Sequence, residues 1–325
     1  MLNLNFENMK LKSVFKLSAY VLCTLFTISA CKKDDVGSDE IPVNITLSGR
    51  GNTGNIGGQT EDEIGTLRII IVGNGSETIV YNTLLSEENS QEGLWSQTFN
   101  LQPGLYDFYM VANEQSIAYE NINSPDIKIS DLENHILEGN AADYTSNGIP
   151  FSEIKRKVRI TKDTPSLGPI KMKRALSKIC LSFKNETGTE QTITDMKIEG
   201  IKANEGYLFF HTEKGAATRF DDLVFSNPLK VPADANEENI LHTEYIYPGT
   251  NPSITDCYYL TAKWNNNDQK IPIKDDSFDQ IVGGYIPRNT QLNIVVTLKK
   301  NEGICAEVTC TVKEWESVPL GPSFE

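Results

Sequence analysis

The chain has 325 residues, with 30 Lys and Arg against 44 Asp and Glu, and its formal net charge is −14 at pH 7. Such an acidic surface repels nucleic acid and anionic lipid, so the composition excludes a nucleic-acid partner. The length is sufficient for two domains of ordinary size, each with its own hydrophobic core.

The N-terminal 30 residues predict export as a lipoprotein. Lysines precede an apolar stretch at residues 17–30, which has the length of a secretory h-region and is too short to span a bilayer as a helix. Ile28-Ser29-Ala30-Cys31 places small residues directly before a cysteine, as lipoprotein processing requires. We expect a signal peptide at 1–30, cleavage between Ala30 and Cys31, and acyl chains such as palmitate on Cys31. The alternative is an ordinary signal peptide in which Cys31 is incidental.

Short β-strands dominate the first half of the mature chain. Residues 31–42 are polar and are expected to form a flexible tether. Val43-Asn44-Ile45-Thr46-Leu47 alternates apolar and polar residues, and the β-branched run at 67–72 is typical of a strand buried on both faces. Other strands are predicted at Trp95–Leu101, Leu105–Ala112, Lys157–Thr161 and Ile170–Phe183. Ser130-Asp131-Leu132-Glu133 has the form of a capping box and predicts one short helix.

The second half continues the same pattern. Strands are predicted at Ile193–Ile201, Tyr207–Phe210, Cys257–Trp264, Leu292–Leu298 and Val308–Trp315. Because no series of amphipathic helices separates them, the pattern argues against βαβ units. We therefore predict an all-β protein with two tandem β-sandwich domains of the transthyretin-like or Ig-like type.

The junction between the two sandwiches is expected near residue 167. Apolar residues occupy even positions at Ile170 and Met172 but odd positions from Ala175 onward, so the buried face changes near Arg174. A turn-rich stretch at 163–169 precedes this change. The predicted organisation is an N-terminal sandwich at 43–166 and a C-terminal sandwich at 167–325.

No arrangement of residues in the sequence predicts catalysis or a cofactor. The histidines His135, His211 and His242 are scattered, and no HExxH or GxSxG motif occurs. We therefore expect no catalytic residue, no metal site and no cofactor. Asp221-Asp222 and Asp275-Asp276 lack the EF-hand spacing and are interpreted as solvated loops.

Cysteines and tyrosines leave alternatives open. Cys180, Cys257, Cys305 and Cys310 remain in the mature chain, and in an oxidising compartment they could pair or stay as buried thiols. The tyrosines Tyr245, Tyr247, Tyr258 and Tyr259 could line a glycan-binding platform, although their positions in strands favour packing in the core.

Several segments together resemble the fimbrillin family of Bacteroidales, the FimA/Mfa-type pilus subunits. The resemblance extends over most of the mature chain and lies in the segments Leu105–Asn113, Met172–Ile179, Ile286–Thr290 and Val312–Trp315. Lys32-Lys33-Asp34-Asp35 is also similar to the charged signal that directs lipoproteins to the outer face of the outer membrane.

The resemblance implies a mechanism of assembly. Such subunits are exported as lipoproteins, and an extracellular arginine-specific protease removes the first strand in polymerising members. A strand of another subunit then fills the vacated groove. Arg50-Gly51 follows the first predicted strand within a glycine-rich stretch and is the candidate cleavage site. Cleavage there would release Val43, Ile45 and Leu47 as a plug strand.

The candidate donor strand lies at the C-terminus. Its apolar residues are Val308, Cys310, Val312, Val318 and Leu320. Pro319 and Pro322 oppose a continuous ladder in the tail. If Val308–Trp315 is a fixed strand of the second sandwich, the protein is expected to be a tip or accessory subunit that accepts a strand and donates none. An anchor subunit would instead keep its lipid and leave Arg50 uncut.

The sequence therefore predicts a cell-surface fimbrial subunit that mediates adhesion. Its expected partners are other pilus subunits, an arginine-specific protease, the outer membrane through its lipid, and ligands on host or bacterial surfaces. The alternative function is a lipid-anchored glycan-binding protein. An enzyme such as a glycoside hydrolase is disfavoured because nothing in the sequence positions two carboxylates across a cleft.

Overall fold

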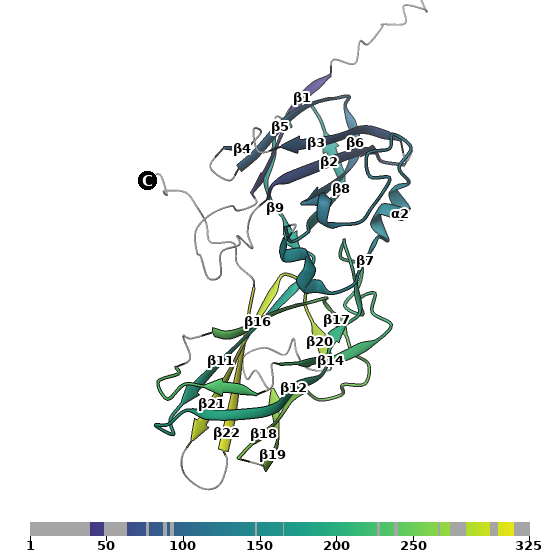
Figure 1. Cartoon of the computed structure of the whole chain (residues 1–325). Helices are drawn as coiled ribbons and strands as arrows, with labels where there is room; N and C mark the ends of the chain where they lie inside the picture. Colours follow the sequence, from purple (N-terminus) through teal and green to yellow (C-terminus); the bar gives the residue numbers. More distant parts are fainter. Residues whose placement is uncertain are drawn as a thin grey trace, which may run out of the picture.

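The computed structural model is almost entirely β-structure, arranged as two sandwiches along the chain (Figure 1). Among the residues it describes, no helix is long and apolar enough to cross a membrane. The described residues are 40–48, 64–75, 78–86, 90–91, 94–146, 148–164, 166–225, 228–236, 240–265, 267–273, 284–299 and 305–314.

The first sandwich contains two sheets around one hydrophobic core. Sheet A has the strand order β4-β5-β1-β9, with β4 at Ser90–Gln91, β5 at Leu94–Leu101, β1 at Ile41–Ser48 and β9 at Ser166–Lys171. Sheet B has the order β10-β8-β6-β2-β3, with β10 at Lys173–Arg174, β8 at Phe151–Ile160, β6 at Gly104–Ala112, β2 at Thr66–Gly73 and β3 at Ile79–Ser86.

Strand β2 illustrates why this sandwich forms. The expected strand at 67–72 is present, and its residues Leu67 to Val72 are all buried. One face of β2 meets the core and the other is covered by the segment that follows β6. The buried Arg68 anchors this cover: its guanidinium forms an ion pair with Glu114 and donates to Asn82 Oδ1 at 2.6 Å. A charge inside the fold is tolerated because it is paired and hydrogen-bonded.

The second sandwich has its own core and two further sheets. Sheet D has the order β16-β11-β21-β22, with β16 at Ile240–Ile246, β11 at Ser177–Asn185, β21 at Thr290–Lys299 and β22 at Cys305–Glu314. Sheet E has the order β14-β12-β18-β19, with β14 at Phe220–Val224, β12 at Gln191–Ala203, β18 at Tyr258–Trp264 and β19 at Asn267–Ile273. Strand β15 at Leu229–Val231 also pairs with β12. The two cores confirm the expected all-β architecture.

Among the described strands, each sandwich contains one parallel pair, and the sequence pattern does not reveal it. Strand β1 pairs in parallel with β9, and β11 pairs in parallel with β21. Parallel neighbours require a long connection, which here runs through intervening strands, most of them in the opposite sheet. The pairing therefore brings together strands from the start and the end of each sandwich.

Strand pairing places the change from the first sandwich to the second later in the chain than the expected boundary near residue 167. Residues 166–171, interpreted from the sequence as partly turn, form strand β9 in sheet A, and β10 pairs with β8 in sheet B. The predicted strand at 170–183 is thus three strands, which pass from one sandwich to the other between Arg174 and Ser177. We propose that the domain boundary lies there, because hydrogen-bonded pairing keeps β9 and β10 in the first sandwich.

The two sandwiches share a close-packed joint. The small sheet C pairs β7 at Ile136–Glu138 with β13 at Glu205–Tyr207, and Phe209 of the second half is buried in the first core. A second small sheet, F, pairs β17 at Gly249–Thr250 with β20 at Tyr285–Ile286. Arg288 donates from Nε to the carbonyl of Arg174 at 3.0 Å and from Nη2 to Ser152 Oγ at 3.0 Å. Desolvation lowers the pKa of Arg288 to about 10, so its guanidinium remains charged at neutral pH.

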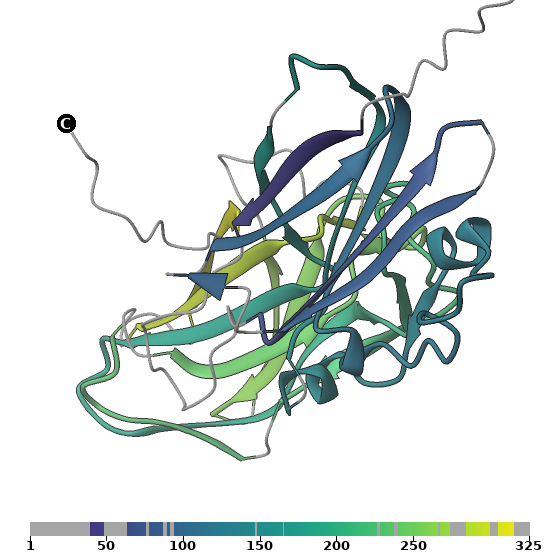
Figure 2. The ribbon, with the colours of Figure 1, turned by 90° about the horizontal axis from the view of Figure 1, so that it is seen from above.

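The helical segments in the described part of the chain are short (Figure 2). They are η2 at Glu114–Ser116, α2 at Ile129–Glu133 and η3 at Ala141–Ser146. Helix α2 is the predicted short helix, but the capping box is not formed. Its N-cap is Lys128 without a side-chain hydrogen bond, and Ser130 lies inside the helix. The main-chain carbonyl of Lys128 accepts from the amides of Asp131 and Leu132, so the turn closes without a hydroxyl cap.

Candidate functional site

Strand β1 lies inside sheet A, between two partners. It pairs antiparallel with β5 over its whole length, from Ile41 opposite Leu101 to Ser48 opposite Leu94. On its other side it pairs in parallel with β9. Figure 2 shows the purple β1 between these two strands. Removal of β1 would therefore leave two strand edges without partners, one on each side of the gap.

The side chains of β1 alternate between core and surface. Val43 and Ile45 are completely buried and Leu47 is 1% exposed. The expected strand at 43–47 is therefore present, with its apolar face in the core. On the outer face, Asn44 Oδ1 accepts a hydrogen bond from Ser96 Oγ of β5 at 2.9 Å. This alternation fixes the register, because a shift by one residue would place Asn44 and Thr46 in the core.

Strand β9 approaches β1 closely at a glycine. A Cβ atom on Gly168 would lie 2.3 Å from the carbonyl oxygen of Thr46, and the φ of Gly168 is +133°. Only glycine fits this position without displacement of β1. The register between the strands also shifts here, from Ile45 opposite Leu167 to Leu47 opposite Ile170. Sequence reasoning missed this contact, although Gly168-Pro169 between Leu167 and Ile170 was a signal for an irregular strand.

The groove that β1 fills is lined by large apolar side chains. Trp95, Phe99 and Leu101 of β5 and Ile170 of β9 are all buried in the same core. The burial of Val43, Ile45 and Leu47 contributes about 5–9 kcal/mol, at about 1.5–3 kcal/mol for each side chain. An empty groove would expose this apolar surface together with two open edges, which favours association with another strand.

The residues predicted for processing lie outside the described part of the chain. Ala30 and Cys31, the predicted cleavage and lipidation site, belong to residues 1–39. Arg50 and Gly51 belong to 49–63. The predictions for these positions therefore stay predictions.

Part of the candidate donor strand is paired in the fold. Val308, Cys310 and Val312 lie in β22, which pairs antiparallel with β21 from Thr290 opposite Glu314 to Lys299 opposite Cys305. The side chains of β22 lie outside the described residues, as do Val318 and Leu320 entirely. Strand β22 is the last strand of sheet D, so its other edge has no partner among the described strands.

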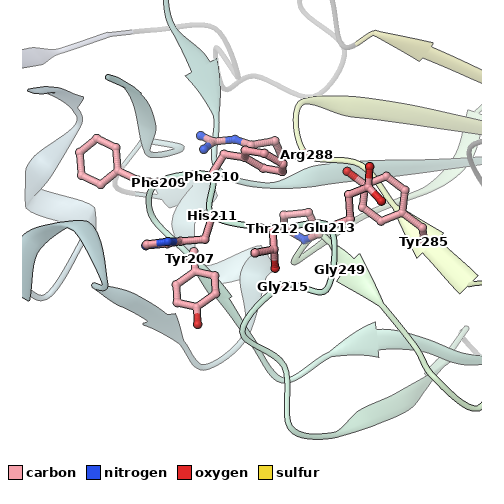
Figure 3. Close-up of a pocket in the computed structure, with 11 residues that line it drawn as sticks. Tyr207, Phe209, Phe210, His211, Thr212, Glu213, Gly215, Gly249, Tyr285 and Arg288 are labelled. Carbon is pink, nitrogen blue, oxygen red and sulfur yellow. The ribbon is translucent and has the colours of Figure 1, made fainter. Parts of the chain in front are cut away.

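A small pocket occurs beside the joint (Figure 3). Tyr207 and His211 form one side, with ring centroids 4.7 Å apart, and Arg288, Tyr285 and Phe210 contribute to the rest. The space accessible to water is about 20 Å³. That volume holds about one water molecule, so the pocket does not accommodate an organic ligand.

The described histidines pack against aromatic rings. His135 contacts Tyr119, His211 contacts Tyr207, and His242 contacts Phe225, at centroid distances of 4.9, 4.7 and 4.9 Å. Desolvation lowers the pKa of His135, so this ring is neutral near pH 7. Within the described ranges, no group of three or more His, Cys, Asp or Glu side chains is placed to hold a metal ion.

Most of the tyrosines considered for a glycan platform are in the core. Tyr245, Tyr247 and Tyr258 are 8%, 1% and 1% exposed. Tyr259 is half-buried, and Lys270 Nζ lies 4.6 Å from its ring centroid. The platform interpretation is therefore wrong for three of the four residues, because they point into the sandwich.

The structure describes only some of the aspartates and cysteines that the sequence analysis singled out. Asp221 forms an ion pair with Arg219, with Nη2 at 3.0 Å from Oδ2, and Asp222 forms one with Lys197, with Nζ at 2.7 Å from Oδ2. Asp275-Asp276 lies outside the described residues. Cys180 and Cys257 are buried in the fold. The side chains of Cys305 and Cys310 lie outside the described residues.

Comparison with solved structures identifies the fold. No protein-family model matches the sequence, and no curated protein matches it. The tip fimbrial protein Mfa3 from Porphyromonas gingivalis, solved with a C-terminal truncation, superposes with a TM-score of 0.58 at 13% identity, over 85% of this chain and 100% of that chain. The fold is that of the fimbrillins. A fimbrilin (FimA) from Porphyromonas gingivalis also superposes, with a TM-score of 0.55 at 12% identity, over 86% of this chain and 99% of that chain.

The fimbrillin fold accounts for both sandwiches. The alignments cover 85% and 86% of this chain and nearly the whole of each neighbour, so the similarity of fold extends over both sandwiches. The resemblance noted from short sequence segments is therefore confirmed at the level of the fold. Within this fold, the opening strand β1 of the present chain lies in the interior of a sheet.

Proposed function

We propose that this protein is a structural subunit of a cell-surface fimbria that takes part in adhesion and that accepts a strand from a neighbouring subunit at the position of β1. The neighbours in fold are fimbrial proteins, which supports the general role. The proposed assembly requires no enzymatic chemistry by this chain, because strand addition uses backbone hydrogen bonds and apolar side chains.

One observation carries the proposal. Strand β1 is fully integrated in sheet A, yet the chain between β1 and β2 is a glycine-rich stretch that contains Arg50. A single cut after Arg50 would separate β1 from everything that follows it. The strand would then be held only by its lateral hydrogen bonds and by the burial of its apolar side chains.

The incoming strand would have to reproduce what β1 provides. Alternate apolar side chains would replace Val43, Ile45 and Leu47, and its backbone would pair with β5 and β9. The apolar burial recovered is about 5–9 kcal/mol. The ordering of a free strand offsets part of this, so exchange is favourable only where the incoming side chains fill the same space.

The pairing of β22 supports an accepting subunit over a donating one. Donation of this strand would break its ladder with β21 before a neighbour could gain it. A subunit that accepts a strand and keeps β22 would terminate a fimbria, which is the role expected of a tip or accessory subunit. A stalk subunit would need β22, or the segment after it, to leave sheet D.

Export and anchoring complete the proposal. We propose that residues 1–30 are removed and that acylated Cys31 attaches the chain to the outer face of the outer membrane through the tether at 31–42. An arginine-specific protease would then release the mature subunit from its anchor. Ligands on host or bacterial surfaces are the proposed targets of adhesion.

The decisive experiment identifies the N-terminal residue of the protein on cells by mass spectrometry. We expect Gly51 in the assembled fraction and lipidated Cys31 in the membrane fraction. Purified chain that is cleaved by an arginine-specific protease and mixed with fimbrial subunits that can donate a strand should form complexes that resist detergent. A cleaved chain that forms no such complex with these subunits contradicts strand acceptance.

Two matched variants control this experiment. Arg50→Lys keeps the positive charge but removes the arginine, so an arginine-specific protease should leave it uncut and monomeric while trypsin still cuts it. Arg50→Ala should resist both enzymes at this position. If Arg50→Lys assembles as the native chain does, the protease acts elsewhere and the proposed cleavage site is wrong.

A further inference from the structure

Strand β3 differs from the other strands that end a sheet. It is the last strand of sheet B, and in the part of the chain that the structure describes it pairs only with β2. Proteins normally protect such edges with charged residues or proline. The end strands β7, β9, β10, β13, β14, β15, β16, β19 and β22 all contain at least one such residue, and the end strands β4, β17 and β20 have only two residues each.

The eight residues of β3 contain no such protection. Its sequence, IVYNTLLS, has no charged residue and no proline. On its outer face Val80 is 42% exposed and Leu84 is 47% exposed. Asn82 lies between them, with its amide donating to the carbonyl of Ile122 at 2.8 Å. Strand β3 thus presents two large apolar side chains around a position whose polar group is already satisfied.

The spacing of these residues is self-complementary. In a two-fold antiparallel pair, residues opposite each other lie on the same face and their numbers have a constant sum. The register centred on Asn82 places Val80 opposite Leu84 of a second copy, and Leu84 opposite its Val80. Registers centred on Tyr81 or Thr83 place each apolar residue opposite a polar one. One register therefore covers both exposed side chains.

The net charge of the molecule also favours β3 as the contact between two copies. At a net charge of −14, two copies repel each other over most of their surfaces. An uncharged edge is where that repulsion is weakest and where hydrogen bonds can form between backbones. We propose that β3 is a lateral interaction surface for a second copy of this chain, which pairs antiparallel about Asn82. This surface is separate from the groove of β1 and does not depend on strand acceptance there.

Paired cysteines test the register directly. The double variant Val80→Cys/Leu84→Cys in the full chain should form a disulfide-linked dimer under mild oxidation, seen on a non-reducing gel. Each single variant places its two cysteines about 13 Å apart along the strands, which is too far for a disulfide. Dimer from the double variant alone supports the proposal. Equal dimer from a single variant, or none from the double, overturns it.

Charge substitution tests the surface independently. Leu84→Lys should raise the Kd of self-association, measured by sedimentation equilibrium, by at least about tenfold, because it restores edge protection. Val224→Lys is the matched control, since Val224 is 66% exposed on the end strand β14. It should leave the Kd unchanged. Both measurements use the Arg50→Ala background, so that strand exchange cannot contribute. A native chain that stays monomeric overturns the proposal.

Discussion

The opening strands of the two sandwiches, β1 and β11, occupy equivalent places. Each lies inside a four-stranded sheet with one antiparallel and one parallel neighbour. Each also buries its inward side chains: Val43 and Ile45 of β1 and Ile179 and Leu181 of β11 are all 0% exposed. By burial and pairing alone, neither strand is easier to remove than the other.

The two strands differ in what holds their ends. Strand β11 begins at Ser177, which donates to the carbonyl of Pro287 at 2.5 Å. It ends at Asn185, whose amide donates to the carbonyls of Thr189 and Pro232 at 2.9 and 2.8 Å. Strand β1 is followed in the sequence by Gly49-Arg50-Gly51. If β1 is removed as we propose, the property that distinguishes it from β11 is the connection that follows it, because the two strands are equally buried.

Excision of β1 is the test of this comparison with the largest expected effect. A chain that begins at Gly51 should lose about 5–9 kcal/mol in the first sandwich, which is most of the stability of a typical domain. Calorimetry should show loss of the first transition while the second sandwich still melts. A peptide of residues 41–48 should restore the first transition, and the same peptide with Ile45→Asp should not. An unchanged first transition would contradict the role of β1.

Matched core substitutions should have the next largest effect. Ile45→Ala and Leu181→Ala each remove a fully buried side chain and should each lower the free energy of unfolding by about 2–5 kcal/mol in the uncut chain. Urea denaturation after cleavage and loss of β1 should show no remaining effect of Ile45→Ala. The effect of Leu181→Ala should persist. Persistence of both effects would mean that β1 stays in place after cleavage.

A glycine substitution tests the parallel side of β1. Gly168→Ala should lower the free energy of unfolding by about 1–3 kcal/mol, because its Cβ would collide with the carbonyl of Thr46 in addition to the strained φ. Gly75→Ala is the control, since its φ is +87° but nothing lies within 4 Å of its Cβ. The difference between the two variants in the free energy of unfolding, measured by urea denaturation, gives the energetic cost of the collision. Equal effects would mean that β9 can move away from β1.

The smallest expected effect is a pH dependence confined to the second sandwich. A hydrogen bond from Lys197 Nζ at 2.7 Å lowers the pKa of the Asp222 carboxyl below its ordinary value of 3.8. A lowered pKa stabilises the fold above pH 3.8, and this contribution is lost as the pH falls through the folded pKa. The difference in unfolding free energy between the native chain and Asp222→Asn should therefore shrink on acidification. A difference in unfolding free energy that grows in acid would contradict a stabilising interaction between Lys197 and Asp222.

Local patterns were sufficient for much of the fold. The alternation at 43–47, the β-branched run at 67–72 and the alternation at 292–298 each correspond to a strand, because the period of two follows from the backbone of a strand itself. The strand at 79–86 was missed, since Tyr81, Asn82 and Thr83 interrupt the alternation of apolar residues. Similarly, Gly168-Pro169 resembled a turn although it lies within β9.

The sequence by itself determined that the chain is all-β, acidic and built of strands with one buried face, because these properties depend on composition and on neighbouring residues. Only the tertiary structure decided that β1 lies between β5 and β9, that β9 and β10 pair within the sheets of the first sandwich, and that β3 pairs with a single neighbour among the described strands. The physical reason is that strand pairing joins residues far apart in the chain, and hydrogen bonds between backbones leave no mark on the local pattern of side chains.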